Sequence, residues 1–358
     1  MYTTIEIHNF RQIKSLRAEG LRRINLIVGR NNSGKTTFLE AMNLLCAATY
    51  PSVLIGLGQL RGHKYSFHNL TQILTPLFHN LDTGINIEIK GRRAEEEDDR
   101  ILSIKPITHL TFHPETIKSD KVIERISENQ KNPPISGLEL SYANSKGKVF
   151  SSFLKRDPSS GNLNHDPVWS DDFRPMTMVS TFACASFQTL SILFSELKSG
   201  KVKDVVLDAV QIVEPSIKEL VVLSEENGSS LYADIGIDKL IPISACGAGT
   251  TRCLSIVLDM FVMQNGALLI DDIDNGLHYS VMKGFWEKLD ELAKQLNVQI
   301  VATTHNEEMM RLALSVFADK PGTLGLFRID RKEDRHVFTV YDDEAMRAVA
   351  EYNFETRG

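Results

Sequence analysis

The sequence predicts an α/β protein with a mixed central sheet, an antiparallel β-rich insertion and a helical lobe. Short apolar runs such as 24–28 and 267–270 have the composition of strands that are covered on both faces. Segments with helical spacing of apolar residues alternate with these runs. Residues 51–175 differ, because apolar and polar residues alternate there between polar turns, as in antiparallel strands. We therefore expect a head domain formed by 1–50 and 176–358, with 51–175 inserted into it.

The first predicted elements are two strands and a helix. Residues 4–7 alternate in period 2, as a half-buried strand does, and 24–28 form a denser apolar run that leads directly into Gly29. A helix is expected over 36–48, because apolar residues recur there at helical spacing.

Within the insertion, alternating segments predict strands at four places: 85–89, 101–104, 138–142 and 149–154. The turns between these strands are polar and include an acidic run at 95–99. We expect this run to be a solvated loop tip, and the alternative is a contact for a basic partner.

After the insertion, the pattern predicts a helical lobe over about 187–225, with a break in the helix near Gly200. The elements expected next are, in order, short strands around a turn at 226–228, a helix from Thr250, a strand over 267–270, a helix over about 279–295, a strand over 298–302, a hairpin from 324–329 and 336–341, and a last helix.

Composition and charge exclude several classes of protein. The chain is 42% hydrophobic and 24% charged, as ordinary globular proteins are, and its formal net charge of −6 argues against a broad basic surface wrapped on nucleic acid. Its 4 cysteines form no CxxC pair, which fits a reducing compartment. No apolar run approaches the ~18 residues of a membrane span, and no signal core is present. We expect a cytoplasmic protein without a membrane partner.

A phosphate-binding loop follows the strand at 24–28. The segment GRNNSGKT at 29–36 fits GxxxxGK[ST] without a mismatch, between a predicted strand and a predicted helix. Its glycines let backbone N–H groups face a phosphate, and the helix adds its positive end. Lys35 is expected to reach the β- and γ-phosphates and Thr36 to bind Mg²⁺. The sequence thus predicts a P-loop NTPase (Walker A motif) in which the nucleotide contacts are Gly29, Asn31, Asn32, Ser33, Gly34, Lys35, Thr36 and Thr37.

The strand at 267–270 ends in Asp271, which suits a carboxylate that holds Mg²⁺. ABC-type ATPases normally have glutamate at the next position, where it polarises the attacking water. Here the residue is Asp272, whose carboxylate stands about 1.5 Å further back. A shift of that size can cost orders of magnitude in rate, so we expect slow ATP hydrolysis. A competing interpretation takes Asp272 and Asp274 as the DxD pair of a metal-dependent nuclease.

Further motifs predict that a second copy of the chain completes the site. In the segment 244–252, Gly247 and Gly249 lie at a turn that opens a helix, which makes a second anion site. One P-loop cannot use two such sites on one nucleotide. In ABC-ATPase heads this position is the signature loop, which binds the γ-phosphate held by the partner. Residues 275–278 match the D-loop and His305 matches the switch histidine, while the absence of an NKxD motif favours ATP over GTP.

Together these motifs resemble RecF/SMC-like ATPases, and more specifically the AAA-type ATP-binding proteins related to the OLD (overcoming lysogenization defect) ATPases. The segments that carry the resemblance are 5–11, 24–36, 271–280 and 302–305, whereas 51–175 match poorly. That group typically has glutamate at the positions of Asp272 and Asp274. The resemblance implies an ABC-type head that forms a homodimer through an ATP sandwich, with Arg11 as a further nucleotide contact.

The resemblance also implies a nucleotide-driven switch that serves prokaryotic anti-phage defence with a nuclease effector. Full OLD proteins carry a C-terminal Toprim nuclease domain, and the about 50 residues after His305 are too few for one, so we expect a separate effector. Two alternatives stay open, an ATP-binding scaffold with little hydrolysis and a RecF-like DNA-repair head that clamps DNA. The loose candidates for the basic stripe that DNA would need are Arg11, Lys14, Arg17, Arg22, Arg23, Arg92 and Arg93.

Overall fold

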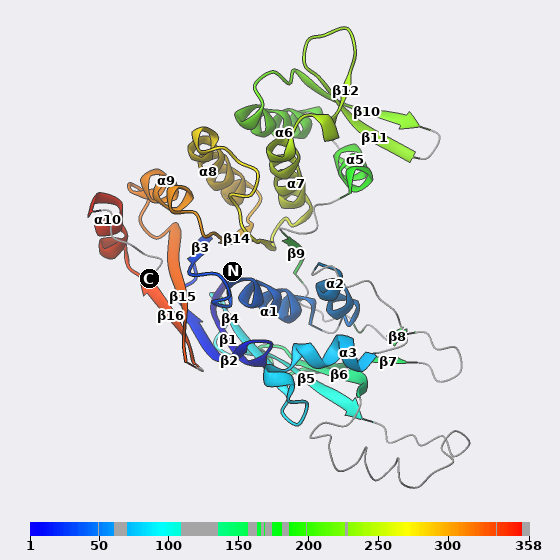
Figure 1. Cartoon of the computed structure of the whole chain (residues 1–358), viewed down its shortest axis with the longest axis vertical. Helices are drawn as coiled ribbons and strands as arrows, with labels where there is room; N and C mark the ends of the chain where they lie inside the picture. The colour runs from blue at the N-terminus through cyan, green and yellow to red at the C-terminus, as the bar shows by residue number, and fades with distance from the viewer. Residues whose placement is uncertain are drawn as a thin grey trace.

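Among the residues that it describes, the computed structural model has three sheets, with helices between and beside them (Figure 1). The structure describes residues 1–48, 50–60, 70–108, 135–156, 163–165, 168, 174–180, 186–197, 199–225, 228–333 and 335–352.

A seven-stranded antiparallel sheet has the order β2-β1-β4-β5-β6-β7-β8. Its strands are β1 (Tyr2–Phe10), β2 (Ile13–Glu19), β4 (Ile87–Arg93), β5 (Arg100–Thr108), β6 (Ile135–Ala143), β7 (Val149–Arg156) and β8 (Leu163–His165). Because β1 pairs directly with β4, the strands of the expected insertion extend a sheet that begins in the first residues of the chain. The domain boundaries near residues 50 and 175 remain a prediction.

The central sheet is mixed, as predicted, and has the order β16-β15-β3-β14-β13-β9. Its strands are β3 (Ile24–Val28), β9 (Met176–Val179), β13 (Ala267–Ile270), β14 (Gln299–Thr303), β15 (Leu324–Lys332) and β16 (Arg335–Tyr341). All neighbours run parallel except β15 and β16. Every residue of β3, β13 and β14 is buried, which explains why these segments are apolar runs without alternation.

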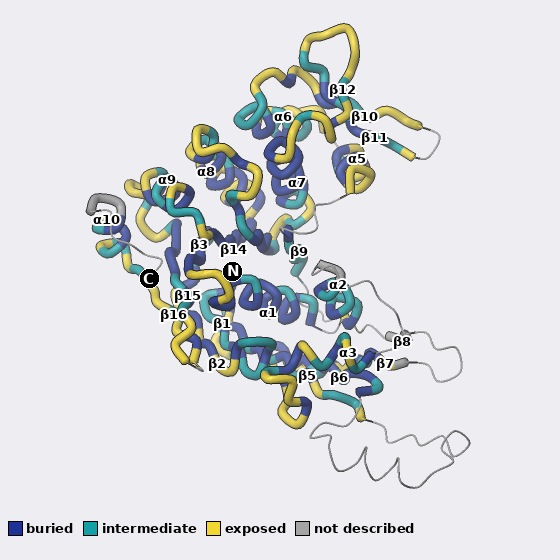
Figure 2. Tube along the Cα trace, in the orientation of Figure 1, coloured by how far each residue is buried: buried dark blue, intermediate teal, exposed yellow. Residues whose placement is uncertain are grey.

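Helix α1 (Lys35–Ala47) lies between the antiparallel sheet and one face of the central sheet (Figures 1 and 2). Its side chains Phe38 and Met42 belong to a core that also contains Leu269 and Val301 of the central sheet and Ile89 of the antiparallel sheet. The helix that opens at the phosphate-binding loop is therefore fixed on both sides by apolar packing.

Other helices form a second core with the opposite face of the central sheet, some of them directly and some through a neighbouring helix. They are α5 (Phe187–Glu196), α6 (Gly200–Val213), α7 (Ala248–Val262), α8 (Tyr279–Gln295), α9 (Glu307–Phe317) and α10 (Asp343–Tyr352). The predicted lobe contains α5, α6 and β10 (Glu219–Glu225), and β10 joins β11 (Gly228–Asp234) and β12 (Ile241–Pro242) in a small sheet. Residues 226 and 227 of the predicted turn lie outside the described residues.

Two helices in the first part of the chain were not predicted. These are α2 (Ser52–Leu60) and α3 (Leu70–Leu74), and α3 leads into the short 3₁₀ turns η1 (Thr75–Leu77) and η2 (His79–Leu81). The segment 52–60 is apolar on all sides and contains two glycines, so it lacks an amphipathic helical pattern. Leu54 and Leu57 are buried in the core that contains α1, and tertiary packing therefore decides its conformation.

Two buried amides connect the central strands to their surroundings. The side chain of Asn25 donates to the backbone oxygens of Arg22 and Ile300, at 2.7 and 2.9 Å. The side-chain amide of Gln299 both accepts from the backbone N–H of Tyr2 and donates to its carbonyl, at 2.8 and 2.7 Å. Each amide is thus satisfied by backbone groups of another segment.

Within the described part of the chain, no helix has the length and apolarity required to cross a bilayer.

Candidate functional site

The P-loop connects the carboxyl end of β3 to the first turn of α1. Gly34 is the residue that caps α1, and its φ of 107° is a left-handed conformation that glycine adopts without strain. The first turn of this 13-residue helix therefore opens directly onto the loop. An open groove of about 640 Å³ lies beside the loop tip, lined by Arg30, Asn31, Asn32 and residues of β15 and β16.

Lys35 folds back over the loop. Its ammonium group donates to the backbone oxygens of Gly29 and Arg30, at 2.8 and 3.0 Å. Burial lowers the pKa of Lys35, while the nearby Asp272 and Asp271 oppose that shift. The ammonium therefore lies within the loop where it is predicted to contact the β- and γ-phosphates.

Asp271 joins three segments that are far apart in the chain. Thr36 of α1 donates its hydroxyl to the Asp271 carboxylate, at 3.1 and 3.0 Å from its two oxygens. Thr303 at the end of β14 donates to the same carboxylate at 2.7 Å. Burial raises the pKa of Asp271, and the hydrogen bonds from Thr303 and Thr36 oppose the rise. The structure thus brings the two predicted Mg²⁺ ligands, Thr36 and Asp271, within hydrogen-bonding distance.

The donor set at this point fits Mg²⁺. A hydroxyl and a carboxylate supply hard oxygen ligands, and Mg²⁺ typically uses one or two protein oxygens together with water and substrate phosphates. Thr36 and Asp271 are the side chains that would hold the ion.

A buried arginine supports the acidic strand end. Arg252 on α7 is 2% exposed and donates to the backbone oxygens of Ser180 and Asp271, at 2.8 and 2.6 Å. Neither Arg252 nor Thr303 was predicted from the sequence to have a role in the site. A threonine at the end of an apolar strand is the signal that could have indicated Thr303, whereas Arg252 lies in a segment that also contains threonine, serine and aspartate and gives no such signal.

Asp272 and His305 face the same edge of the site. The backbone of Asp272 is left-handed, with a φ of 45°, and its N–H donates to the Thr303 hydroxyl at 2.9 Å. Nδ1 of His305 lies 3.3 Å from Oδ1 of Asp272. His305 is 57% exposed, so both groups are accessible from outside. The structure therefore pairs Asp272 and His305, which together with Lys35 are the residues predicted to be catalytic.

Asp274 has a different environment. Its carboxylate accepts a hydrogen bond from the Thr304 hydroxyl, next to His305. Among the residues that the structure describes, no group of three or more His, Cys, Asp or Glu side chains could hold a metal ion. The interpretation of Asp272 and Asp274 as a nuclease metal pair stays an alternative prediction.

The predicted signature loop and D-loop lie against each other. Gly249 in the first turn of α7 is so close to the backbone oxygen of Gly276 that a Cβ at Gly249 would overlap it. Gly247, Ala248 and Asn275 are exposed around this contact. The opening of a 15-residue helix and the turn after Asp274 therefore form one accessible surface.

Arg11 lies in the β1–β2 turn beside α1. Its guanidinium pairs with the buried carboxylate of Glu40 at 2.7 Å, one turn beyond Thr36. The neighbouring Gln12 reaches Thr37 at 3.5 Å. This turn therefore adjoins the first turns of the P-loop helix, and its contact with nucleotide stays a prediction.

Most members of the loose basic stripe are paired with acidic side chains. The pairs in addition to Arg11 are Arg17 with Glu19, Arg22 with Asp343, Arg92 with Asp99, and Arg93 with Glu96. The acidic run at 95–99 supplies two of these partners, and its Glu95 pairs with Arg174, which is outside the stripe. These ion pairs reduce the net positive charge that the stripe offers to DNA.

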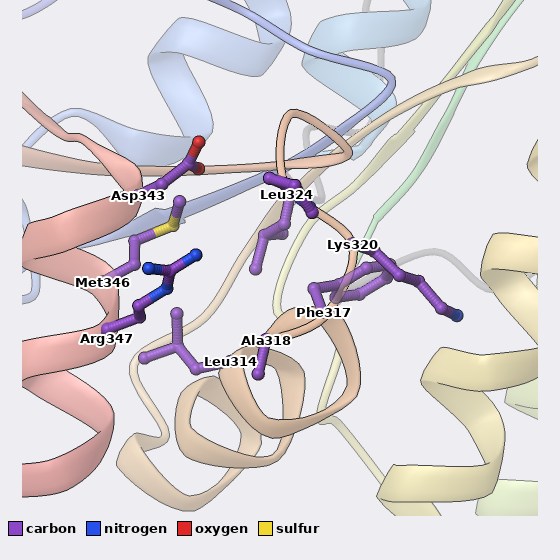
Figure 3. A pocket seen from close by; sticks show the side chains of 9 residues that line it. Leu314, Phe317, Ala318, Lys320, Leu324, Asp343, Met346 and Arg347 are labelled. Atoms are coloured by element: carbon purple, nitrogen blue, oxygen red, sulfur yellow. The ribbon is translucent and has the colours of Figure 1, made fainter.

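A separate apolar cavity of about 180 Å³ lies between α9 and α10 (Figure 3). Leu314 and Phe317 of α9 and Met346 of α10 line it, and the Arg347 side chain extends into it from α10. None of the predicted site residues lines this cavity.

Comparison with known proteins agrees with this geometry. Residues 24–311 match the family model described as "AAA domain, putative AbiEii toxin, Type IV TA system". A protein of Helicobacter pylori named "ATP/GTP phosphatase" is 20% identical over 341 residues, which cover 89% of each chain.

Solved structures of SMC heads have a similar fold. The Smc head domain with an extended coiled coil bound to the C-terminal domain of ScpA, from Pyrococcus furiosus, aligns with a TM-score of 0.50 at 11% identity and covers 99% of both chains. An SmcHead bound to the C-winged helix domain of ScpA has a TM-score of 0.49 at 13% identity, over 97% of this chain and 99% of the other. The predicted fold class, a P-loop NTPase of the ABC-ATPase head type, is confirmed.

The matched region contains β3, the P-loop, Asp271 and His305, which are the parts that the structure gathers at one edge of the central sheet. This chain belongs to the family described as AAA domain, putative AbiEii toxin, Type IV TA system, and it is an ATPase of the ABC/AAA type.

Proposed function

We propose that this protein is a Mg²⁺-dependent ATPase whose ATP-bound form is a homodimer that controls a separate effector protein. The observation that carries the proposal is the contact of Thr36, Asp271 and Thr303, which links the P-loop, the acidic strand end and the neighbouring strand. A phosphate-binding loop, a metal-binding carboxylate and a polar strand end are the parts that phosphoryl transfer requires.

Each polar side chain of the site has a role in this chemistry. Bound Mg²⁺ would neutralise charge on the β- and γ-phosphates and orient them. Lys35 contacts the phosphates in exchange for its two loop carbonyls. Asp272 accepts a proton from the attacking water, and His305, 3.3 Å from that carboxylate, positions the water and the terminal phosphate.

The carboxylate of Asp272 limits the rate. It is one methylene shorter than glutamate, and a displacement of about 1.5 Å from the best geometry lowers the rate by a large factor. Slow hydrolysis suits a switch, because the ATP-bound state then persists long enough to act on an effector.

The exposed surface at Gly247, Ala248 and Asn275 is the part that a partner copy would use. Positive helix ends bind phosphate, and the first turn of α7 is accessible next to the turn at Gly276. In the dimer, this surface of one protomer covers the γ-phosphate held by the P-loop of the other. Assemblies larger than the dimer can form from such dimers.

The family description and one structural relative support control of a separate protein. The family is described by a putative toxin of a type IV TA system, and the SMC head of Pyrococcus furiosus was solved bound to ScpA. We infer that the dimer holds or releases an effector, a nuclease in a prokaryotic anti-phage system. DNA remains an alternative partner.

The proposed dimer can be tested with two separate substitutions to glutamate on α7, one at its start and one at its end. Asp272→Asn protein with ATP and Mg²⁺ is expected to shift from monomer to dimer in analytical ultracentrifugation. Adding Ala248→Glu should abolish the dimer while ATP binding persists, because the new carboxylate repels the partner's γ-phosphate. The matched control is Val262→Glu, at the exposed far end of α7, which should still form dimers. Equal dimer fractions in both double variants would refute the proposed interface.

Nucleotide preference is measured in the same preparation. The Helicobacter pylori relative is named for phosphatase activity on both ATP and GTP, whereas this chain lacks an NKxD motif. We expect turnover of ATP to exceed turnover of GTP. Equal kcat/KM values for the two nucleotides would contradict this preference.

A further inference from the structure

A buried histidine packs directly on the P-loop. His336 lies on β16 with 8% of its surface exposed. A Cβ built on Gly34 would lie only 3.3 Å from its Cδ2 and 3.5 Å from its Nε2, so the ring edge faces the cap of α1. Neither ring nitrogen has a hydrogen-bond partner among the described residues. The imidazole therefore brings unsatisfied polar atoms to the start of the phosphate-binding helix.

Packing alone does not explain a histidine here. Phe338, the next residue on the same face of β16, fills its space with an apolar ring that stacks on Phe38 of α1 at 5.6 Å between centroids. An apolar ring at His336 would fill the same space without leaving two buried nitrogens unsatisfied, which is unfavourable. The nitrogens thus indicate a polar group that binds beside Gly34.

The neighbours of His336 locate that group relative to a nucleotide. In a P-loop site the helix hydroxyl lies at the metal between the β- and γ-phosphates, and loop and helix N–H groups hold the α- and β-phosphates. Gln12 lies 3.6 Å from the same Cβ position at Gly34 and 3.5 Å from the Thr37 hydroxyl. The pair of His336 and Gln12 therefore lies past Thr36 on the side of the first helical turn, where the α-phosphate and ribose leave the loop.

We propose that His336 and Gln12 form a subsite for the α-phosphate–ribose part of the bound nucleotide, with a ring N–H of His336 donating to one of its oxygens. The inference rests on the proposed ATP site and adds a residue of β16 to it. Burial, together with the charges of Arg331 and His79, lowers the pKa of His336, so the ring is neutral and keeps one N–H donor near neutral pH. Strand β16 comes after Lys35, Asp271 and His305 in the chain. Through this subsite, binding of a nucleotide would therefore also stabilise the C-terminal hairpin of β15 and β16.

The experiment compares His336→Leu, His336→Gln and wild-type protein. Isothermal titration calorimetry gives the affinity for ATP, 2′-deoxy-ATP and inorganic tripolyphosphate, each with Mg²⁺. His336→Leu is expected to bind ATP about tenfold more weakly, since one hydrogen bond to a charged or hydroxyl oxygen is lost. His336→Gln keeps a donor and should recover most of the affinity. Val337→Thr, a neighbouring exposed position on the other face of β16, is the matched control and should match wild type.

Comparing ATP, tripolyphosphate and 2′-deoxy-ATP distinguishes whether His336 binds an oxygen of the α-phosphate or an oxygen of the ribose. Weaker binding of both ATP and tripolyphosphate by His336→Leu supports a contact with the α-phosphate. Weaker binding of ATP alone supports a contact with the ribose, and 2′-deoxy-ATP then shows whether the 2′-hydroxyl is the acceptor. Wild-type affinity for all three ligands in folded His336→Leu and His336→Gln proteins would overturn the subsite. Failure of wild-type protein, and not only of the variants, to bind ATP would instead refute the proposed function.

Discussion

At the level of single residues, we propose that the position of the Asp272 carboxylate limits the rate of ATP hydrolysis. Its carboxylate reaches His305 at 3.3 Å, but the side chain is short and its backbone is already left-handed. A longer carboxylate at the same backbone position extends toward the terminal phosphate by about one carbon–carbon bond.

We therefore predict that Asp272→Glu raises kcat for ATP by at least about tenfold, and that Asp272→Asn lowers it by about 10²-fold or more, because the base is removed. Steady-state phosphate release measures both rates. ATP affinity should stay within about threefold in either variant, and an unchanged kcat in Asp272→Glu protein would show that side-chain length does not limit turnover.

Individual site residues could be predicted from the sequence where spacing and neighbours define them. Lys35, Thr36 and Asp271 follow apolar strands in the order that a P-loop enzyme needs, and the structure brings them together. Arg252 and His336 could not be predicted in this way, because their partners lie on segments remote in the chain. Their roles depend on tertiary contacts that no local pattern encodes.

At the level of elements, helix α7 contains Asp259, whose loss of a proton lowers the free energy of unfolding. Burial raises the pKa of Asp259 to about 6, and the nearby Ser255 hydroxyl and the charge of Arg252 only partly oppose the rise. The unfolded chain releases this proton near pH 3.8, so the folded state binds more protons between these values. The contribution of Asp259 to stability is therefore largest below pH 3.8, and this contribution is lost as the pH rises through about 6.

Asp259→Asn removes this titration. The gap between 3.8 and about 6 corresponds to about 3 kcal/mol at most, so the variant should be about 1–3 kcal/mol more stable than wild type at pH 8. The difference should fall toward zero at pH 4. Urea unfolding at the two pH values measures it, and a difference independent of pH would exclude Asp259 as its source.

The contact between α1 and the antiparallel sheet gives a second test at this level. A Cβ on Gly91 of β4 would lie 2.5 Å from Leu45 and 2.9 Å from Tyr2, whereas a Cβ on Gly56 of α2 would meet nothing within 4 Å. Gly91→Ala should lower the free energy of unfolding by about 1–3 kcal/mol through overpacking. Gly56→Ala should raise it by about 0.5–1 kcal/mol through helix propensity. Urea midpoints that move in the same direction would contradict this assignment.

The elements themselves could be predicted to different degrees. The strands and helices around Gly29, Asp271 and His305 were found because apolar runs and helical spacing were clear. Strand β9 was missed, since Met176–Val179 is only 4 residues long and becomes a strand by pairing with β13. Helix α2 was missed because its residues are apolar on every side.

At the level of the whole molecule, binding of the nucleotide should raise the free energy of unfolding of the protein. A ligand at 100 times its Kd adds about 2.7 kcal/mol to the free energy of unfolding. MgATP at that concentration should raise the Tm of wild-type protein by a few degrees in differential scanning calorimetry. Lys35→Ala protein should show no shift, because the principal phosphate ligand is absent.

The overall architecture followed from the sequence more completely than its division into domains did. The order of apolar runs gave the mixed central sheet, and alternation gave the antiparallel strands. The pairing of β1 with β4 could not be read from local patterns, because the two strands are separated by α1, α2 and α3. Long-range strand pairing depends on which edges remain open after the helices have packed.

The two buried amides of the central sheet also determine how its strands are aligned. Strands that are apolar throughout can slide past one another without exposing anything, since both of their faces are covered in every alignment. A slide of β3 against β14 by one residue would displace the P-loop by about 3.3 Å and separate Thr36 from Asp271. Asn25 of β3 opposes this slide because its amide donates to the carbonyl of Ile300 on β14, and Gln299 holds β14 against Tyr2 of β1. Two buried, uncharged side chains thereby help to fix the distances between the residues of the proposed nucleotide site.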